Sequence, residues 1–99
     1  MPTVNISLEA EADIDAITHY TKNNWGWRQA NIYLARLEET FELLARSPSL
    51  GRSCGTLAPG LRRFESGRHV VFYREQIDGV LIVRILHQRQ LPLRSRFQP

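Results

Sequence analysis

Seven basic side chains in the second half of the chain have types and spacing that could do chemistry. They interrupt runs of β-branched and aromatic residues, at Arg62, Arg68, His69, Arg74, Arg84, His87 and Arg89. Arginine offers a permanently charged, planar fork that fits phosphate and carboxylate groups, and histidine can gain or lose a proton near neutral pH. We predict that these residues form a binding surface for an acidic partner, and we assign none of them as catalytic.

Phosphodiester chemistry is the alternative use of the same side chains. Arg84 and Arg89 could hold a phosphate while His87 transfers a proton. Both His69 and His87 lie at a strand end, where a histidine can equally serve only as a structural hydrogen-bonding residue. Three such groups alone make a weak nuclease, so we favour binding over catalysis.

Arg84 leaves two placements open. It lies between Val83 and Ile85, and strand alternation predicts that its side chain points opposite to both. If helices cover the Val83 and Ile85 face, Arg84 lies on an open face and can bind a partner. Otherwise it must be paired in the interior with an acid such as Glu65 or Asp13.

Charge divides the chain unequally. Residues 1–45 carry three basic and seven acidic side chains, a net charge of −4, whereas residues 46–99 carry ten arginines and three acids, a net of +7. The basic half contains no lysine, although lysine is the more common solubilising cation. This pattern indicates an acidic partner, which could be a nucleic acid or an acidic protein segment.

The elements that position the basic side chains can be read from the sequence pattern. Residues 68–89 form two β-rich runs around Asp78-Gly79, a strong signal for a β-hairpin. Residues 61–65 predict a further strand before it, so three consecutive strands should form an antiparallel meander. A short strand is also predicted at residues 3–6.

Two helices are predicted between the first strand and the meander. Ser7 stands at an N-cap position, and apolar residues at helical spacing predict a helix over residues 8–22. A second helix is predicted over residues 27–46, with Gly26 ending the first one. We expect Trp25 and Trp27 to pack the helical hairpin against the sheet rather than to form a stacking platform.

The predicted fold is therefore a two-layer α+β domain in the order β-α-α-β-β-β. The antiparallel helical hairpin packs on one face of a small, mostly antiparallel sheet and leaves the other face open for Arg and His side chains. Residues 48–60 read as a loop, and the tail at residues 90–99 as extended or partly ordered. The 99 residues suffice for a single domain.

Composition limits the other function classes. The single cysteine, Cys54, forms no intrachain disulfide and reads as an incidental loop thiol, and no His/Cys cluster has zinc-ligand spacing. We predict neither a metal nor a cofactor. The sequence has no long apolar run and no signal-peptide pattern at its start, which predicts a soluble, cytoplasmic protein.

The order and spacing of several motifs resemble the ParE toxins of the RelE/ParE superfamily of bacterial toxin-antitoxin systems. These motifs are Trp25-Gly26-x-x-Gln29-Ala30-x-x-Tyr33, Pro48-x-x-Gly51-Arg52, Gly60-Leu61-Arg62, His69-Val70-Val71-Phe72-Tyr73-Arg74 and Val83-Arg84-Ile85-Leu86-His87-x-Arg89. The resemblance implies a toxin that inhibits DNA gyrase by binding. It also implies a ParD-like antitoxin that wraps the toxin with a segment that is disordered when free.

The same superfamily contains ribosome-dependent messenger-RNA endonucleases of the RelE type. Those enzymes use basic strand residues together with a tyrosine near the C-terminus, whereas this chain has no tyrosine after Tyr73. We therefore prefer gyrase inhibition to RNA cleavage. A relative that binds its antitoxin but is no longer toxic is the third possibility.

Overall fold

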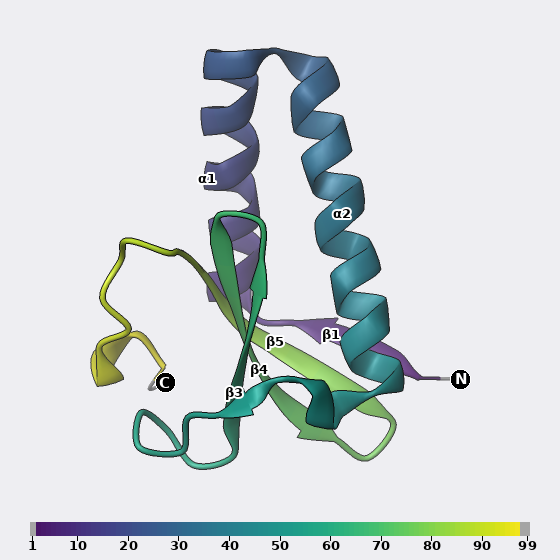
Figure 1. Cartoon of the computed structure of the whole chain (residues 1–99), viewed down its shortest axis with the longest axis vertical. Helices are drawn as coiled ribbons and strands as arrows, with labels where there is room; N and C mark the ends of the chain where they lie inside the picture. Colours follow the sequence, from purple (N-terminus) through teal and green to yellow (C-terminus); the bar gives the residue numbers. More distant parts are fainter. Residues whose placement is uncertain (1, 98–99) are drawn as a thin grey trace.

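The computed structural model describes residues 2–97, and its secondary structure follows the predicted order (Figure 1). The elements are β1 (Thr3–Ile6), α1 (Leu8–Trp25), α2 (Trp27–Arg46), a 3-10 turn (Pro48–Leu50), β2 (Arg52–Ser53), β3 (Leu61–Ser66), β4 (His69–Gln76), β5 (Gly79–His87) and a second 3-10 turn (Arg94–Arg96). The five strands form one sheet in the order β1-β5-β4-β3-β2. The predicted α+β class is confirmed, and β2 adds a short edge strand inside the predicted loop.

Local sequence signals explain where the helices begin and end. The Ser7 hydroxyl accepts a 3.0 Å hydrogen bond from the Ala10 N–H and so caps α1. Helix α1 continues to Trp25, three residues beyond the predicted end at residue 22, so Asn23 and Asn24 belong to the helix. Gly26, with φ of 89°, is the only residue between α1 and α2, and glycine adopts this backbone conformation without steric cost.

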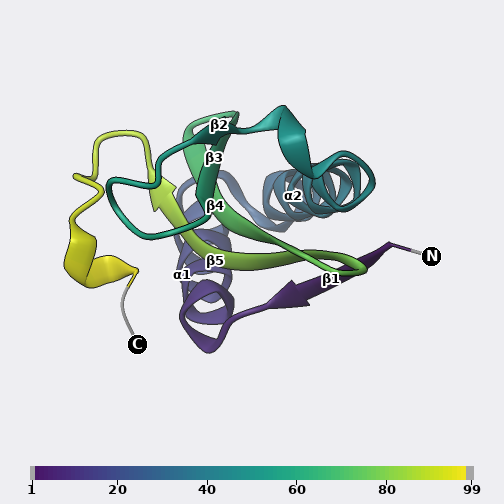
Figure 2. The same ribbon diagram turned by 90° about the horizontal axis from the view of Figure 1, so that it is seen from below.

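The two helices cover one face of the sheet and form the larger core cluster (Figures 1 and 2). Ala10 and Ile17 from α1 and Leu37, Phe41 and Leu44 from α2 are buried there. The strands supply the opposite side of this cluster, with Val71, Tyr73, Val80, Ile82 and Ile85. Burial of these apolar side chains is the main force that holds the hairpin on the sheet.

The β4–β5 hairpin is confirmed, with its turn one residue earlier than predicted. Gln76 pairs with Gly79, so Ile77 and Asp78 form the turn and Gly79 begins β5. Strand β1 pairs with β5 in parallel, with Thr3 opposite Gly79. A Cβ atom on Gly79 would overlap the Thr3 backbone, so a glycine is required for this close approach.

A β-bulge in β5 changes the predicted alternation of side chains. Phe72 pairs with Arg84 whereas Tyr73 pairs with Ile82, which leaves Val83 as an extra residue in β5. Val83 consequently packs in the second core cluster and Ile85 in the first. The prediction that Val83 and Ile85 share a face is therefore wrong, because strict alternation does not continue through a bulge.

The face of the sheet opposite the helices is not open, contrary to the prediction. A second core cluster covers it, formed by Ala58, Leu61, Val70, Phe72, Val83, Leu86 and Phe97. Its outer side comes from the loop after β2 and from the C-terminal tail, which lie close together in Figure 2. The ring centroids of Phe97 and Phe72 are 4.8 Å apart. The tail is thus ordered as far as Phe97, and residues 98 and 99 lie outside the described part of the chain.

No helix within residues 2–97 is long and apolar enough to cross a membrane. The same residues contain no group of three or more His, Cys, Asp or Glu side chains placed to hold a metal ion.

Candidate partner-binding groove

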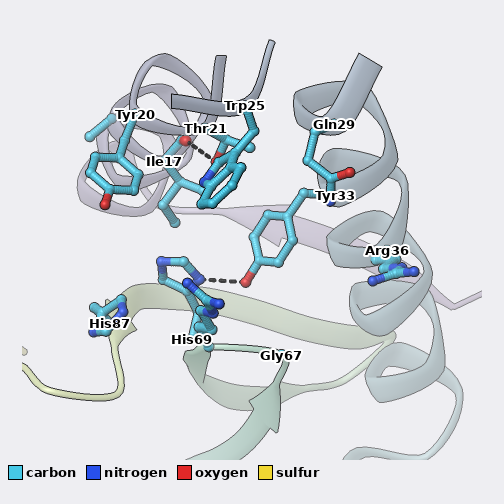
Figure 3. A pocket seen from close by; sticks show the side chains of 12 residues that line it. Ile17, Tyr20, Thr21, Trp25, Gln29, Tyr33, Arg36, Gly67, His69 and His87 are labelled. Atoms are coloured by element: carbon cyan, nitrogen blue, oxygen red, sulfur yellow. Dashed lines mark hydrogen bonds between the residues drawn. The ribbon is translucent and has the colours of Figure 1, made fainter. Parts of the chain in front are cut away.

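A groove with a volume of about 810 Å³ runs between the two helices and the ends of β4 and β5 (Figure 3). Helix α1 contributes apolar and aromatic side chains, and α2 contributes polar ones from successive turns. The turn between β3 and β4 closes the lower end. The lining residues are Ala16, Ile17, Tyr20, Thr21, Trp25, Gln29, Tyr33, Arg36, Gly67, Arg68, His69 and His87.

Tyr33 and His69 form the floor of this groove. The Tyr33 hydroxyl donates a 3.2 Å hydrogen bond to the Ser66 carbonyl oxygen and is also hydrogen-bonded to His69 Nδ1. A hydroxyl has one proton, so both bonds are satisfied when His69 carries its proton on Nδ1 and donates it to the Tyr33 oxygen. The His69 ring also meets the His87 ring edge to face, with centroids 5.4 Å apart.

His69 is uncharged at neutral pH in this environment. Burial lowers the pKa of its imidazole to about 4, with a further contribution from the nearby His87 and an opposing one from Asp13. The groove floor therefore presents neutral aromatic surfaces. A neutral floor of this kind favours an apolar occupant.

Two arginines place positive charge beside this neutral floor. Arg36 and Arg68 line the groove from α2 and from the β3–β4 turn, and both are exposed. Within residues 2–97 neither guanidinium takes part in an ion pair. An apolar groove with basic residues along it fits an amphipathic segment that carries acidic side chains.

Arg84 has the second of its two predicted placements. Its Nε and Nη2 atoms each donate a 2.8 Å hydrogen bond to a carboxylate oxygen of Asp13 on α1. Asp13 also accepts the Ile85 N–H at 2.9 Å, on the stretch of β5 beyond its pairing with β1. The hydrogen bonds to Asp13 raise the pKa of Arg84 against the opposing effect of burial. Arg84 thus fastens α1 to the sheet.

The remaining predicted site residues separate into two sets. Arg62 donates to the Gly51 carbonyl oxygen at 2.7 Å and Arg74 to that of Pro59 at 3.1 Å, so both hold loop backbone in place. Arg89 is exposed, and its backbone N–H donates to His87 Nδ1 at 3.1 Å. Of the seven predicted residues, the structure brings Arg68, His69 and His87 together in the groove.

Several groove residues lie on the helices and are absent from the predicted set. Gln29, Tyr33 and Arg36 follow one another at spacings of four and three residues, which places them on one side of α2, and Trp25 lines the groove from the end of α1. This helical spacing is the signal in the sequence that points to the α2 side of the groove. The predicted packing of the tryptophans against the sheet is wrong, since Trp25 is 65% and Trp27 60% exposed.

Cys54 lies in a setting that does not activate a thiol. It is partly buried against the second core cluster, and burial raises its pKa despite the nearby Arg63 and Arg52. A thiol with a raised pKa is a poor nucleophile. Cys54 lies in a loop, as predicted, and its raised pKa agrees with the interpretation of an incidental thiol, although the side chain packs against the second core cluster.

Fold and groove together define a small α+β protein that presents a helical hairpin on a sheet, with an open groove between the helices and the ends of β4 and β5. The protein-family model described as the ParE toxin of the type II toxin-antitoxin system, parDE, matches residues 4–92. The chain belongs to this ParE toxin family.

Individual relatives agree with the family match. The chain is 42% identical over 88 residues to Toxin ParE1 of Caulobacter vibrioides, covering 89% of this chain and 91% of that protein. It is 38% identical over 85 residues to Toxin ParE1 of Mycobacterium tuberculosis, covering 85% and 87%. A solved structure described as the chromosomal ParDE TA system from P. aeruginosa shares the fold, with a TM-score of 0.72 at 22% identity over 88% of this chain and 96% of that one.

Proposed function

We propose that this chain acts in the bacterial cytoplasm as a toxin that inhibits DNA gyrase by binding it, and that a ParD-like antitoxin neutralises it by filling the groove. The observation that carries the antitoxin part is the groove itself, about 810 Å³ in volume, in a chain of the ParE family. The gyrase part follows from the family resemblance.

The groove fits a segment that is disordered when free. Such a segment can anchor apolar side chains over Ile17 and Trp25 while its acids pair with Arg36 and Arg68. Ordering the segment on binding lowers the net affinity and keeps the complex open to regulation. A protease can remove the free antitoxin while the folded toxin resists cleavage.

The placement of the basic strand residues supports binding over phosphodiester cleavage. Arg84 is held by Asp13, and Arg62 and Arg74 donate to backbone carbonyls of their own chain. These guanidinium groups are therefore engaged within the fold. A nuclease of the RelE type would need such groups to converge on the scissile phosphate.

A supercoiling assay tests the gyrase part of the proposal. Purified chain added to gyrase and relaxed plasmid should block supercoiling or accumulate cleaved DNA, while translation of a reporter in a cell-free system continues. Codon-dependent RNA cleavage with normal gyrase activity would contradict the proposal. Normal growth of cells that express the chain without antitoxin would instead identify a non-toxic relative.

A charge reversal in the groove tests the antitoxin part. Arg68→Glu should weaken binding of the antitoxin encoded beside this gene by about tenfold or more, because it replaces an attraction with a repulsion. Titration calorimetry with the purified pair measures this change. Arg46→Glu, at an exposed position outside the groove, is the matched control and should bind normally. Equal affinities for both variants would show that the antitoxin binds elsewhere.

A further inference from the structure

Three large aromatic side chains at and near the turn between α1 and α2 are exposed. Trp25 ends α1 and Trp27 begins α2, with 65% and 60% of their surfaces exposed, and Tyr20, five residues before Trp25, is 67% exposed. None of the three belongs to either core cluster. Figure 1 places this turn at the end of the hairpin farthest from the sheet. Grouped exposed aromatics of this kind mark interaction surfaces.

Residues 20–28 form the tip of the helical hairpin, and the formal charges around this hairpin tip have a single sign. Residues 16–37 contain no aspartate or glutamate, and their charged side chains are Lys22, Arg28 and Arg36. The acids of both helices lie outside this segment, toward the sheet. The hairpin is thus acidic near its base and basic at its tip, although the first half of the chain is acidic overall. Such a tip is complementary to an acidic partner.

The tip is also held in a fixed shape. Gly26 alone joins the helices, and its N–H donates to the Lys22 carbonyl oxygen at 2.8 Å while its own carbonyl oxygen accepts the Ala30 N–H at 3.1 Å. The Lys22 ammonium lies 5.0 Å from the Trp27 ring centroid, a cation–π contact that orients the indole. A preorganised surface loses little conformational entropy on binding.

We propose that this hairpin tip is the surface that binds the toxin's target, and that it takes an acidic protein surface with an apolar recess for the Trp27 indole. The inference rests on the proposed function, which makes gyrase that target. Exposed tryptophan and tyrosine beside cations is the composition of protein-binding hot spots. Three cations over residues 16–37 are few for a nucleic-acid partner, whose affinity depends on many phosphate contacts.

The tip is continuous with the groove proposed for the antitoxin. Trp25 and Tyr20 belong to the tip and also line the groove, as Figure 3 shows. An antitoxin segment that fills this end of the groove therefore covers side chains that the target needs. Neutralisation follows from this overlap without any change in the conformation of the toxin.

The test uses tip residues that do not line the groove. Trp27→Ala and the double charge reversal Lys22→Glu/Arg28→Glu should each raise the toxin concentration for half-inhibition of gyrase supercoiling by about tenfold or more, the usual cost of losing a hot-spot residue. Arg46→Glu, at the other end of α2, is the charge-reversal control and should inhibit like the unchanged chain. The far-UV circular dichroism spectrum and the melting temperature should be the same for all variants, which shows that each one folds.

The outcomes separate this inference from the proposed function. If the unchanged chain inhibits gyrase and the tip variants inhibit equally well, the inference is overturned and the proposed function stands. If the unchanged chain leaves gyrase active, the proposed function fails and the target named here fails with it. A third experiment adds a single-stranded oligonucleotide to the chain in the absence of gyrase and follows tryptophan fluorescence. Quenching that is lost in Trp27→Ala would show a nucleic-acid partner and overturn the assignment of a protein partner.

Discussion

At the scale of single residues, the arginines and histidines divide by what their polar atoms contact. Arg62, Arg74 and Arg84 bind acceptors within the chain, whereas Arg68 is exposed beside the groove. Residue type gives each of them the same chemistry, and only the local partner decides its role. His69 shows the same effect, because burial removes its charge at neutral pH.

The depressed pKa of His69 predicts a pH-dependent stability. The imidazole pKa is 6.5 in the unfolded chain and about 4 in the fold. Between these pH values the unfolded chain binds a proton that the folded chain does not. The contribution of His69 to the free energy of unfolding is therefore fully present above pH 6.5 and is lost as the pH falls toward 4. His69→Gln keeps an amide that can bond to Tyr33 and should remove this part of the pH dependence.

We expect the effect of His69 to be about 1–2 kcal/mol, discounted because the ring is partly exposed to solvent. Urea unfolding of the unchanged chain and of His69→Gln at pH 7 and pH 4.5 measures it. The loss of unfolding free energy on acidification should be smaller in the variant. Parallel losses in both proteins would show that His69 keeps an ordinary pKa in the fold.

At the scale of elements, one carboxylate joins α1 to the stretch of β5 that β1 leaves unpaired. Asp13 accepts two hydrogen bonds from Arg84 and one from the Ile85 N–H, and both charged side chains are less than one-fifth exposed, at 15% and 18%. The bulge at Val83 turns Arg84 into position for this pairing. The same contact supports the helix that forms one wall of the groove.

Loss of this carboxylate should destabilise the fold markedly. Asp13→Ala leaves the Ile85 N–H without its acceptor and the largely buried Arg84 guanidinium with only a 3.4 Å hydrogen bond to the Arg96 carbonyl oxygen. We therefore expect a loss of about 2–4 kcal/mol in unfolding free energy. Asp15→Ala, an exposed acid on the same helix, is the control and should change stability by about 0.5 kcal/mol or less. Denaturant titration of both variants measures the difference.

A double-mutant cycle identifies the source of the loss. Arg84→Met should be less harmful in the Asp13→Ala background than alone, because the unpaired charge is then removed as well. Additive effects of the two substitutions would show that the ion pair contributes nothing to stability. The Asp13 effect would then have to come from the Ile85 hydrogen bond alone.

At the scale of the whole molecule, the sheet lies between two apolar layers. The helices cover one face, and the loop after β2 together with the C-terminal tail covers the other. Phe97, 5% exposed, packs on Phe72 and closes the second layer. The tail is consequently a part of the core, although its sequence shows no periodic pattern.

Removal of the Phe97 ring should therefore destabilise the entire domain. We expect Phe97→Ala to cost about 3–4 kcal/mol in unfolding free energy, as for other buried aromatic side chains. Leu93→Ala in the same tail is the control, since Leu93 is 51% exposed, and it should change stability by about 0.5 kcal/mol or less. Thermal unfolding followed by circular dichroism compares the two. Equal melting temperatures for both variants would contradict a core role for the tail.

The sequence alone determined the elements and their order. Helical spacing, the Ser7 cap, Gly26 and the Asp78-Gly79 signal are local features, so they predicted both helices, the meander and the α+β class. The motif order also indicated the ParE family. Local patterns suffice for these features because each depends on residues only a few positions apart.

Only the tertiary structure decided which side chains meet. Asp13 and Arg84 are 71 positions apart in the chain, and the bulge at Val83 that aligns them interrupts the alternation on which the prediction relied. Packing of Phe97 closed a face that the pattern left open. Trp25 and Trp27 ended up exposed because the hairpin extends beyond the sheet, which composition cannot show. Contacts between distant segments depend on how the elements pack, and that information lies in the fold as a whole.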